Sequence, residues 1–200
     1  MKIIGITGSS GSGKSTVCEI LNEKYNVKII DADKIAKELL TSGTEYFNDV
    51  ISKFGREITD DVGEIDRKKL ADLIYNDDKK REMLNNSTFY YVVKEIKLRA
   101  KEANNVDIII DAPLLFESKL DDICNFTIGV IAKESVQIER IIKRDSISKE
   151  QACKRLKAQQ TNNFYMSKCT EIIENNNEYI ETEKQIEEIA KKYNITKKLQ

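Results

Sequence analysis

The sequence has no histidine, a single proline and no long apolar run. Without histidine, the commonest acid–base side chain near neutral pH is missing, so any proton chemistry must rely on other groups. A membrane-spanning helix needs about 18 consecutive apolar residues, and no run approaches that length. The N-terminal segment also lacks the apolar core and the small-residue cleavage site of a signal peptide. We therefore expect a cytoplasmic protein that does not enter a membrane.

The cysteine spacing and the charge balance argue against further classes of protein. Cys18, Cys124, Cys153 and Cys169 stand far apart and form no C-x-x-C pair, which argues against a disulfide framework or a zinc site. The 33 lysines and arginines nearly balance the 34 aspartates and glutamates. Because nucleic-acid-binding domains usually carry a basic excess, we expect no nucleic-acid partner. The sequence leaves the oligomeric state open.

Short apolar segments alternate with amphipathic ones along the 200 residues. This alternation predicts an α/β fold with a mostly parallel five-stranded sheet and helices on both faces. The predicted strands cover residues 2–7, 27–30, 106–111, 126–132 and 171–175. No Pro/Gly-rich linker interrupts the chain, so residues 1–200 are expected to form one unit. In it, residues 1–43 and 106–200 make the core, and the charged, largely helical residues 44–105 make an insertion.

The segment GSSGSGKS, from Gly8 to Ser15, matches the pattern G-x-x-x-x-G-K-[ST]. A chance match in a chain of this length has a probability on the order of 1%. The match follows a predicted strand and opens a predicted helix, as a phosphate-binding loop does. Glycines let the loop turn its N–H groups inward, and the helix start adds free donors and a positive dipole end. The residues predicted to bind ATP here are Gly8, Ser9, Ser10, Gly11, Ser12, Gly13, Lys14, Ser15 and Thr16.

The motif assigns two roles by its chemistry. Lys14 is expected to reach the β- and γ-phosphates, and the Ser15 hydroxyl is expected to bind Mg²⁺. A GTPase would carry an N-K-x-D motif, and a transporter ATPase an L-S-G-G-Q signature; neither is present. The D-x-x-G pattern at residues 60–63 lies in a polar loop and is interpreted as chance. A kinase that phosphorylates a small molecule remains.

Two carboxylates, Asp31 and Asp33, directly follow the second predicted strand. In an open α/β sheet, ligands bind at the carboxyl ends of the strands, so these side chains are placed to meet a substrate. A carboxylate there could accept the proton of an acceptor hydroxyl. Alternatively, one aspartate caps the helix that starts near Lys34. We expect one to be structural or metal-linked and the other catalytic.

Several segments occur together in the order found in one enzyme family. GITGSSGSGKSTV, IDADKIAKEL, DAPLLFE and QIERIIKRD, with FGREITDDVGEIDRKKLADLIYND at 54–77, resemble dephospho-coenzyme A kinases. The resemblance extends from about residue 3 to about residue 176. It implies a P-loop kinase-type three-layer fold with a lid at 133–160 and an acceptor-binding insertion. It also implies phosphorylation of the 3′-hydroxyl of dephospho-coenzyme A to give coenzyme A, with ATP as donor and Mg²⁺ as cofactor.

The resemblance also assigns residues to roles. It implies that Asp33 is the catalytic base and acceptor contact, and that Asp31 and Asp111 lie at the metal with Ser15. The lid would contain Gln137, Arg140, which meets the transferring phosphate, and Arg144, which lies nearer the nucleotide. Asn175 resembles an asparagine near the adenine. The acceptor pocket would be lined by Leu114, Leu115, Phe116 and Glu117.

Other interpretations stay open at several positions. Arg140 and Arg144 lie one helical turn apart and could be ordinary solvated charges. Arg67 could anchor an acceptor phosphate or be a surface arginine. Phe89, Tyr90 and Tyr91 favour core packing over stacking on a ligand base. Arg155 and Gln159 are weaker lid candidates.

The sequence departs from the family pattern at two functional segments. Ser9 and Ser10 follow Gly8 where the family usually has a second glycine, and Phe89 and Tyr90 replace a His-Pro pair in the acceptor-domain helix. The second departure leaves open a kinase for another nucleotide or nucleoside. A regulator that binds ATP without phosphorylating an acceptor is a further alternative.

Overall fold

The computed structural model describes residues 1–75, 77–103, 106–176 and 178–198. The chain divides into two compact units, one made of residues 1–30 and 103–200 and the other of residues 31–102. The predicted insertion, residues 44–105, falls in the second unit as far as residue 102, and residues 104–105 lie outside the described residues. An acceptor-binding role for this insertion stays a prediction.

A five-stranded sheet with the order β2-β3-β1-β4-β5 forms the centre of the first unit. The pairings β1–β3, β1–β4 and β4–β5 are all parallel, which confirms the predicted mostly parallel sheet. The strands are β1 (Ile3–Thr7), β2 (Val27–Asp31), β3 (Asp107–Asp111), β4 (Phe126–Ile131) and β5 (Glu171–Glu174). Because β1 has a parallel neighbour on each side, the segment that follows Thr7 leaves the middle of the sheet's carboxyl edge.

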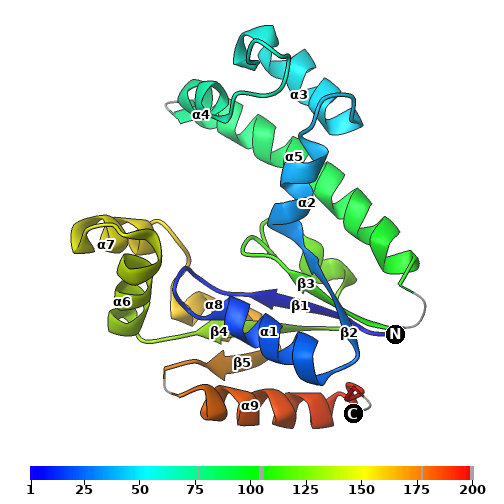
Figure 1. Cartoon of the computed structure of the whole chain (residues 1–200), viewed down its shortest axis with the longest axis vertical. Helices are drawn as coiled ribbons and strands as arrows, with labels where there is room; N and C mark the ends of the chain where they lie inside the picture. Colours follow the sequence, from blue (N-terminus) through cyan, green and yellow to red (C-terminus); the bar gives the residue numbers. More distant parts are fainter. Residues whose placement is uncertain (76, 104–105, 177, 199–200) are drawn as a thin grey trace. The chain divides into compact units, whose positions relative to one another are not determined.

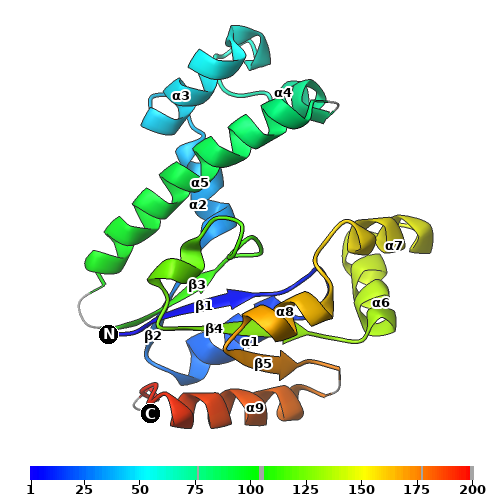
Figure 2. The ribbon, with the colours of Figure 1, turned by 180° about the vertical axis from the view of Figure 1, so that it is seen from behind.

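Helices cover both faces of this sheet, as predicted. The helices of the first unit are α1 (Lys14–Lys24), η2 (Leu120–Ile123), α6 (Glu134–Asp145), α7 (Lys149–Lys157), α8 (Asn162–Lys168) and α9 (Tyr179–Lys192). α1 lies in front of the sheet in Figure 1, and α8 lies in front of it in the reverse view of Figure 2. α1 also packs against α9, which contacts β5.

The core of the first unit is made by β-branched strand residues and one face of each covering helix. Ile4 and Ile6 of β1 pack with Val17 and Ile20 of α1 and Ile186 of α9, and all five are essentially inaccessible to solvent. Burial of each such side chain stabilises the fold by about 1.5–3 kcal/mol. This packing fixes both the strand and the helix between which the glycine-rich segment must run.

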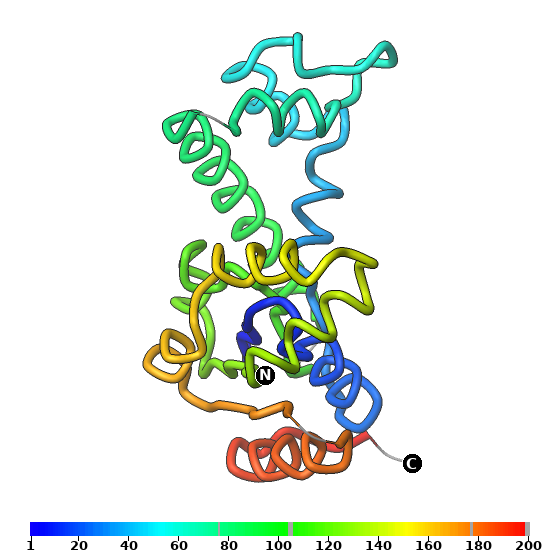
Figure 3. Tube along the Cα trace, turned by 90° about the vertical axis from the view of Figure 1, so that its left-hand side faces the viewer, coloured from blue at the N-terminus to red at the C-terminus, as the bar shows by residue number. Residues whose placement is uncertain are grey.

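The α6–α7 pair forms a hairpin nearest the viewer in Figure 3. Its small core contains Ile138, Ile141 and Ala152. A capping box begins α7: Ser148 Oγ accepts from Gln151 N at 3.2 Å, and Gln151 Oε1 accepts from Ser148 N at 3.0 Å. This hairpin falls within residues 133–160, the predicted lid.

The second unit is helical. It contains α2 (Ala32–Leu39), α3 (Glu45–Phe54), η1 (Arg56–Ile58), α4 (Arg67–Tyr75) and α5 (Asp78–Lys101). The long helix α5 contacts α2, α3 and α4, and Val50, Phe54, Ile58 and Leu70 are buried together between them.

The aromatic segment of α5 only partly follows the predicted core packing. Tyr91 packs beside Tyr46, with ring centroids 5.4 Å apart, and Phe89 is half-buried. Tyr90 is 63% exposed, so the core-packing interpretation is wrong for this residue. Adjacent helix positions are about 100° apart around the axis, so three consecutive residues cannot all face one core.

The four cysteines, all among the described residues, form no disulfide, and Cys18 is buried. Among the described residues, no helix combines the length and the apolar character that crossing a membrane would require.

Candidate functional site

The glycine-rich segment forms a tight loop between the end of β1 and the start of α1. Gly8, Gly11 and Gly13 have φ values of +154°, +76° and +92°. Residues with a Cβ rarely adopt such values, so these three positions require glycine. Gly13 directly precedes α1, whose first backbone N–H groups have no partner within the helix. The loop therefore has the backbone shape of an anion-binding turn at a helix N-terminus.

Other atoms of the protein lie so close to all three glycines that a Cβ would clash with them. A Cβ on Gly11 would lie 2.6 Å from Gln137 O on α6, and a Cβ on Gly8 would lie 2.9 Å from Ser12 Oγ and closer still to Val130 O. A Cβ on Gly13 would lie 2.9 Å from Asn175 Cγ and closer to its Nδ2. The glycines are thus needed for close approach as well as for their dihedrals.

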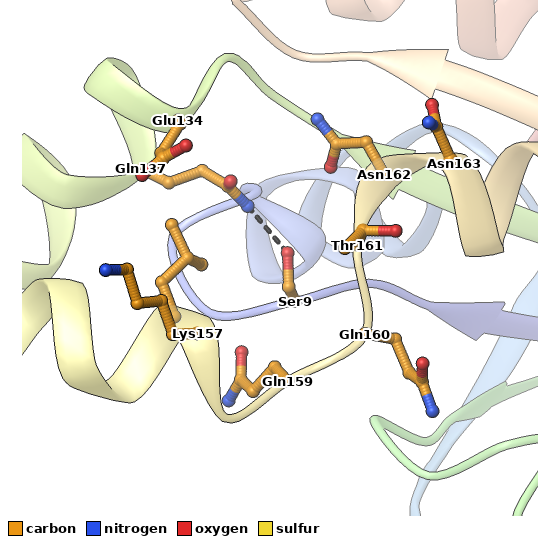
Figure 4. A pocket seen from close by; sticks show the side chains of 10 residues that line it. Ser9, Glu134, Gln137, Lys157, Gln159, Gln160, Thr161, Asn162 and Asn163 are labelled. Carbon is orange, nitrogen blue, oxygen red and sulfur yellow. Dashed lines mark hydrogen bonds between the residues drawn. The ribbon is translucent and has the colours of Figure 1, made fainter.

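The serines that follow Gly8 bind two glutamines of the α6–α7 region. Gln137 Nε2 donates to Ser9 Oγ at 2.6 Å and to Ser10 O at 3.3 Å (Figure 4). Gln159, after α7, accepts from Ser10 N at 2.7 Å and donates to Ser10 Oγ at 3.1 Å. The serines that replace the second glycine therefore connect the loop to the predicted lid.

A cavity of about 430 Å³ borders the loop at Ser9. Figure 4 shows side-chain amides around it, from α6 on one side and from the segment between α7 and α8 on the other. Its polar lining includes Glu134, Gln137, Lys157, Gln159, Gln160, Thr161, Asn162 and Asn163. Such a lining offers both donors and acceptors to a polar ligand.

Arg140, which is half-buried, lies against the loop. Its Nη1 donates to Gly11 O at 3.2 Å, to Ser12 O at 3.3 Å and to Asn175 O at 2.9 Å. The resemblance placed this guanidinium on the transferring phosphate. In the structure its Nη1 donates to the loop carbonyls of Gly11 and Ser12, and contact between Arg140 and the transferring phosphate stays a prediction.

Asn175 also contacts the loop. Its Nδ2 donates to Ser12 O at 3.1 Å, and its backbone N–H donates to Ile131 O at 2.8 Å. Its Oδ1 accepts from Thr182 Oγ1 at 3.1 Å and lies 3.5 Å from Arg140 Nη2. Both ends of the side-chain amide thus have protein partners, and a place for Asn175 near an adenine stays a prediction.

Lys14 and Asp111 form an ion pair, with Nζ donating to Oδ1. Asp111 ends β3, beside β1 in the sheet, so the topology brings its carboxylate to the loop. Ser15, the second residue of α1, is exposed, and Thr16 is half-buried. A carboxylate and a hydroxyl at a phosphate-binding loop are the oxygen ligands that Mg²⁺ takes together with substrate phosphates. No group of three or more Asp, Glu or Cys side chains arranged for a metal occurs among the described residues.

Arg144 takes a different partner from Arg140 although both belong to α6. It pairs with Asp145 through Nε and Nη2 at 2.8 and 2.9 Å, and Arg155 pairs with the same carboxylate. Arg144 holds the pKa of Asp145 below its usual range. Contact between Arg144 and a nucleotide stays a prediction.

The predicted acceptor wall separates into buried and accessible members. Leu115 is fully buried, and a Cβ on Gly5 would lie 2.8 Å from its Cδ2, so it is a core residue and not a pocket wall. Leu114 and Glu117 are exposed, and the half-buried Phe116 packs edge-to-face on Phe164 with centroids 5.7 Å apart.

Three further predicted residues belong to the second unit. Asp31 Oδ1 accepts from Lys34 N at 2.9 Å, which confirms that one aspartate caps α2. Asp33 is exposed in the first turn of α2, and Arg67 is exposed at the start of α4. Their catalytic and acceptor roles stay predictions.

The sequence-based reasoning missed two features of the site. Gln159 was expected only as a weaker lid candidate, and the residues that follow it, QTNN at 160–163, also line the cavity. The concentration of amide side chains directly after a predicted lid helix was a usable signal. Thr182 contacts Asn175 from α9, and nothing in its sequence neighbourhood marks it, because isolated threonines in helices are common.

Comparisons with known proteins identify the family of the chain. The family model described as "Dephospho-CoA kinase" matches residues 2–181. A dephospho-CoA kinase of Fusobacterium nucleatum is 42% identical over 186 residues, covering 92% of this chain and 95% of that protein. One of Bacillus cereus is 36% identical over 197 residues, covering 96% and 98%.

A solved structure shares the fold. The dephospho-CoA kinase from Campylobacter jejuni superposes with a TM-score of 0.67 at 27% identity and covers 96% of each chain. The predicted P-loop kinase fold is thereby confirmed. The chain belongs to the dephospho-CoA kinase family.

Proposed function

We propose that the protein transfers the γ-phosphoryl group of ATP to the 3′-hydroxyl of dephospho-CoA and so makes CoA. Membership of the family supports the reaction, and the relatives named above carry this substrate in their names. The observation that supports ATP as the phosphoryl donor is the loop from Gly8 to Lys14, which has three positive-φ glycines at a helix N-terminus. Such a loop fits a polyphosphate through backbone N–H groups.

Transfer breaks the bond between the γ-phosphorus and the β–γ bridging oxygen and forms one to the acceptor oxygen. ADP leaves with the electron pair of the broken bond, and the hydroxyl proton passes to the Asp33 carboxylate. Because the transition state of phosphoryl transfer is loose, the proton can leave late, and a carboxylate of ordinary basicity suffices. This is consistent with a chain that has no histidine.

Mg²⁺ would be held by Ser15 and Asp111 with phosphate oxygens, and Asp31 is the weaker candidate because its Oδ1 caps α2. When bound, the ion neutralises charge on the phosphates. Lys14, which pairs with Asp111, would exchange this partner for the phosphates. In the same proposal, the substrates are small molecules of the cytoplasm, and neither nucleic acid nor membrane takes part.

A kinase for another nucleotide or nucleoside is the second candidate, because Phe89 and Tyr90 stand where the family often has His-Pro. The deciding experiment incubates the purified protein with ATP, Mg²⁺ and dephospho-CoA and identifies the product by mass. CoA and ADP in equal amounts are expected. Product with adenosine or AMP but not with dephospho-CoA would favour the second candidate. ATP binding without product from any of these acceptors would favour a regulator.

A further inference from the structure

Thr182 is a buried threonine close to the phosphate-binding loop. It hydrogen-bonds to Asn175, whose side-chain amide binds a backbone carbonyl of the loop. Thr182, the fourth residue of α9, is 1% exposed, and Asn175 is 5% exposed. Thr182 Oγ1 donates to Asn175 Oδ1, and Asn175 Nδ2 donates to Ser12 O, both at 3.1 Å. Thr182 lies one residue beyond the segment that matches the family model, residues 2–181.

The surroundings allow only one orientation of the Asn175 amide. A backbone carbonyl only accepts hydrogen bonds, so the amide atom that faces Ser12 O must be nitrogen. A guanidinium only donates, so the atom nearest Arg140 Nη2 must be oxygen. The Thr182 hydroxyl is the closer donor to that oxygen, at 3.1 Å against 3.5 Å for Arg140. Thr182 thus stabilises the orientation in which Asn175 can hold Ser12.

Holding Ser12 O orients the next peptide N–H. The peptide bond between Ser12 and Gly13 is trans, like the others among the described residues, so the Ser12 carbonyl and the Gly13 N–H point in opposite directions. Because the carbonyl faces Asn175 and Arg140, the Gly13 N–H faces away from both. This N–H belongs to the glycine that precedes α1, where loop amides bind phosphate.

We propose that Thr182 is a positioning residue for ATP: through the Asn175 amide it fixes the Ser12–Gly13 peptide so that its N–H is presented to a donor phosphate. The proposal rests on ATP being the donor in the function proposed above and requires nothing of the acceptor. Thr182 itself touches no substrate. Its removal weakens the hold on one peptide, so ATP affinity falls while the acceptor's KM does not.

The test measures ATP binding by calorimetry and the KM of each substrate for Thr182→Val, Thr182→Ser and Thr127→Val. Thr127 is the matched control, because it is buried in β4 and its Oγ1 accepts from Thr170 N at 3.0 Å. Losing this part-buried bond also leaves a backbone N–H without its partner, but away from the loop. We expect Thr182→Val to weaken ATP binding roughly 10-fold, as expected when a buried amide loses a partner. Thr182→Ser keeps the hydroxyl and should restore most of the affinity, and Thr127→Val should stay within about twofold of wild type, the scatter expected for independent sites.

A double-variant cycle keeps the proposal testable if Thr182→Val lowers stability. When Asn175→Ala is already present, Thr182→Val should weaken ATP binding no further, because its route to the loop is gone. Equal losses in both backgrounds, wild-type affinity in folded Thr182→Val, or equal losses for Thr182→Ser and Thr182→Val would overturn it. If the wild-type protein binds no ATP, the proposed function fails first; if it binds ATP and these variants do not differ, only the role of Thr182 fails.

Discussion

Replacing Gly13 with alanine should test the packing of the loop more directly than any change of a charged residue. The new Cβ would lie 2.9 Å from Asn175 Cγ and closer to Nδ2, at a backbone position with φ of +92°. The Asn175 amide cannot simply move away, because it is bound to Ser12 O and Thr182 Oγ1. Relief of the clash must therefore break one of these bonds or shift the loop.

The cost has two separable parts. The left-handed backbone costs an alanine about 1–2 kcal/mol. Breaking a buried amide–carbonyl hydrogen bond and leaving its groups unpaired costs a further ~1–3 kcal/mol. For a chain of 150–250 residues, each kcal/mol lowers Tm by roughly 2–4 °C. Gly13→Ala should thus lower Tm by more than backbone strain alone would, and it should also weaken ATP binding because the displaced peptide lies in the loop.

Two further variants separate strain from clash in melting experiments followed by circular dichroism. Gly43→Ala has a similar φ of +89° and open space around its Cβ, so it reports strain alone. Asn175→Ala removes the atoms that Gly13→Ala would hit, so the cost of Gly13→Ala should be smaller in that background. Equal Tm losses for Gly13→Ala with and without Asn175 would refute the contact and, with it, the view that Asn175 buttresses the loop.

Three other changes have defined outcomes. Asp33→Asn should lower kcat by roughly 10²–10⁴-fold, the usual loss for a general base, with calorimetric ATP affinity retained; near-normal turnover would remove Asp33 from proton transfer. Burial raises the pKa of the half-buried Cys124 thiol from 9.0 to about 12, so at pH 8 its thiolate is roughly 10³-fold scarcer than that of an ordinary cysteine. Mass mapping should find Cys124 labelled by iodoacetamide far more slowly in the folded than in the unfolded protein, and equal rates would contradict the raised pKa. Because Arg144 lowers the pKa of Asp145 in the folded protein, the unfolded state binds a proton at this carboxylate more readily than the folded state does. The ion pair therefore stabilises the folded protein at neutral pH, and this contribution is lost as the pH falls below the ordinary aspartate pKa of about 4. The Tm difference between wild type and Asp145→Asn should therefore shrink from pH 7 to pH 3, and a constant difference would refute the pairing.

The sheet and the loop could be predicted because each rests on a local pattern. Short runs of isoleucine and valine give buried strands, and the glycine spacing from Gly8 to Gly13 gives a loop whose dihedrals no other residue tolerates. The caps at Asp31 and Ser148 could be predicted for the same reason, since each acts on a backbone group three residues away. Short sequence separation is what these successes share.

The groups that hold the loop could not be predicted in the same way. Asn175 and Thr182 lie more than 160 positions from Ser12, and only the docking of β5 and α9 brings them to it. Leu115 was misjudged because a leucine beside a motif gives no sign of whether it faces a ligand or the space above Gly5. Tertiary packing decides such cases.

The spacing of Arg140 and Arg144 predicts which face of the helix they share but not which groups they bind. A separation of four residues puts both on a similar face of α6, and the sequence indicates nothing more. Asp145, the last residue of the helix, takes Arg144, whereas Arg140 reaches carbonyls of Gly11 and Ser12. These bonds occupy Arg140 donors without neutralising its positive charge, because carbonyl oxygens carry no net charge. A positive charge fixed behind the loop attracts phosphate without touching it, since Coulomb interactions at the edge of a protein extend over several ångströms. Arg140 can therefore shape the loop and favour the anion at once, and neither effect requires the guanidinium to leave its carbonyl partners.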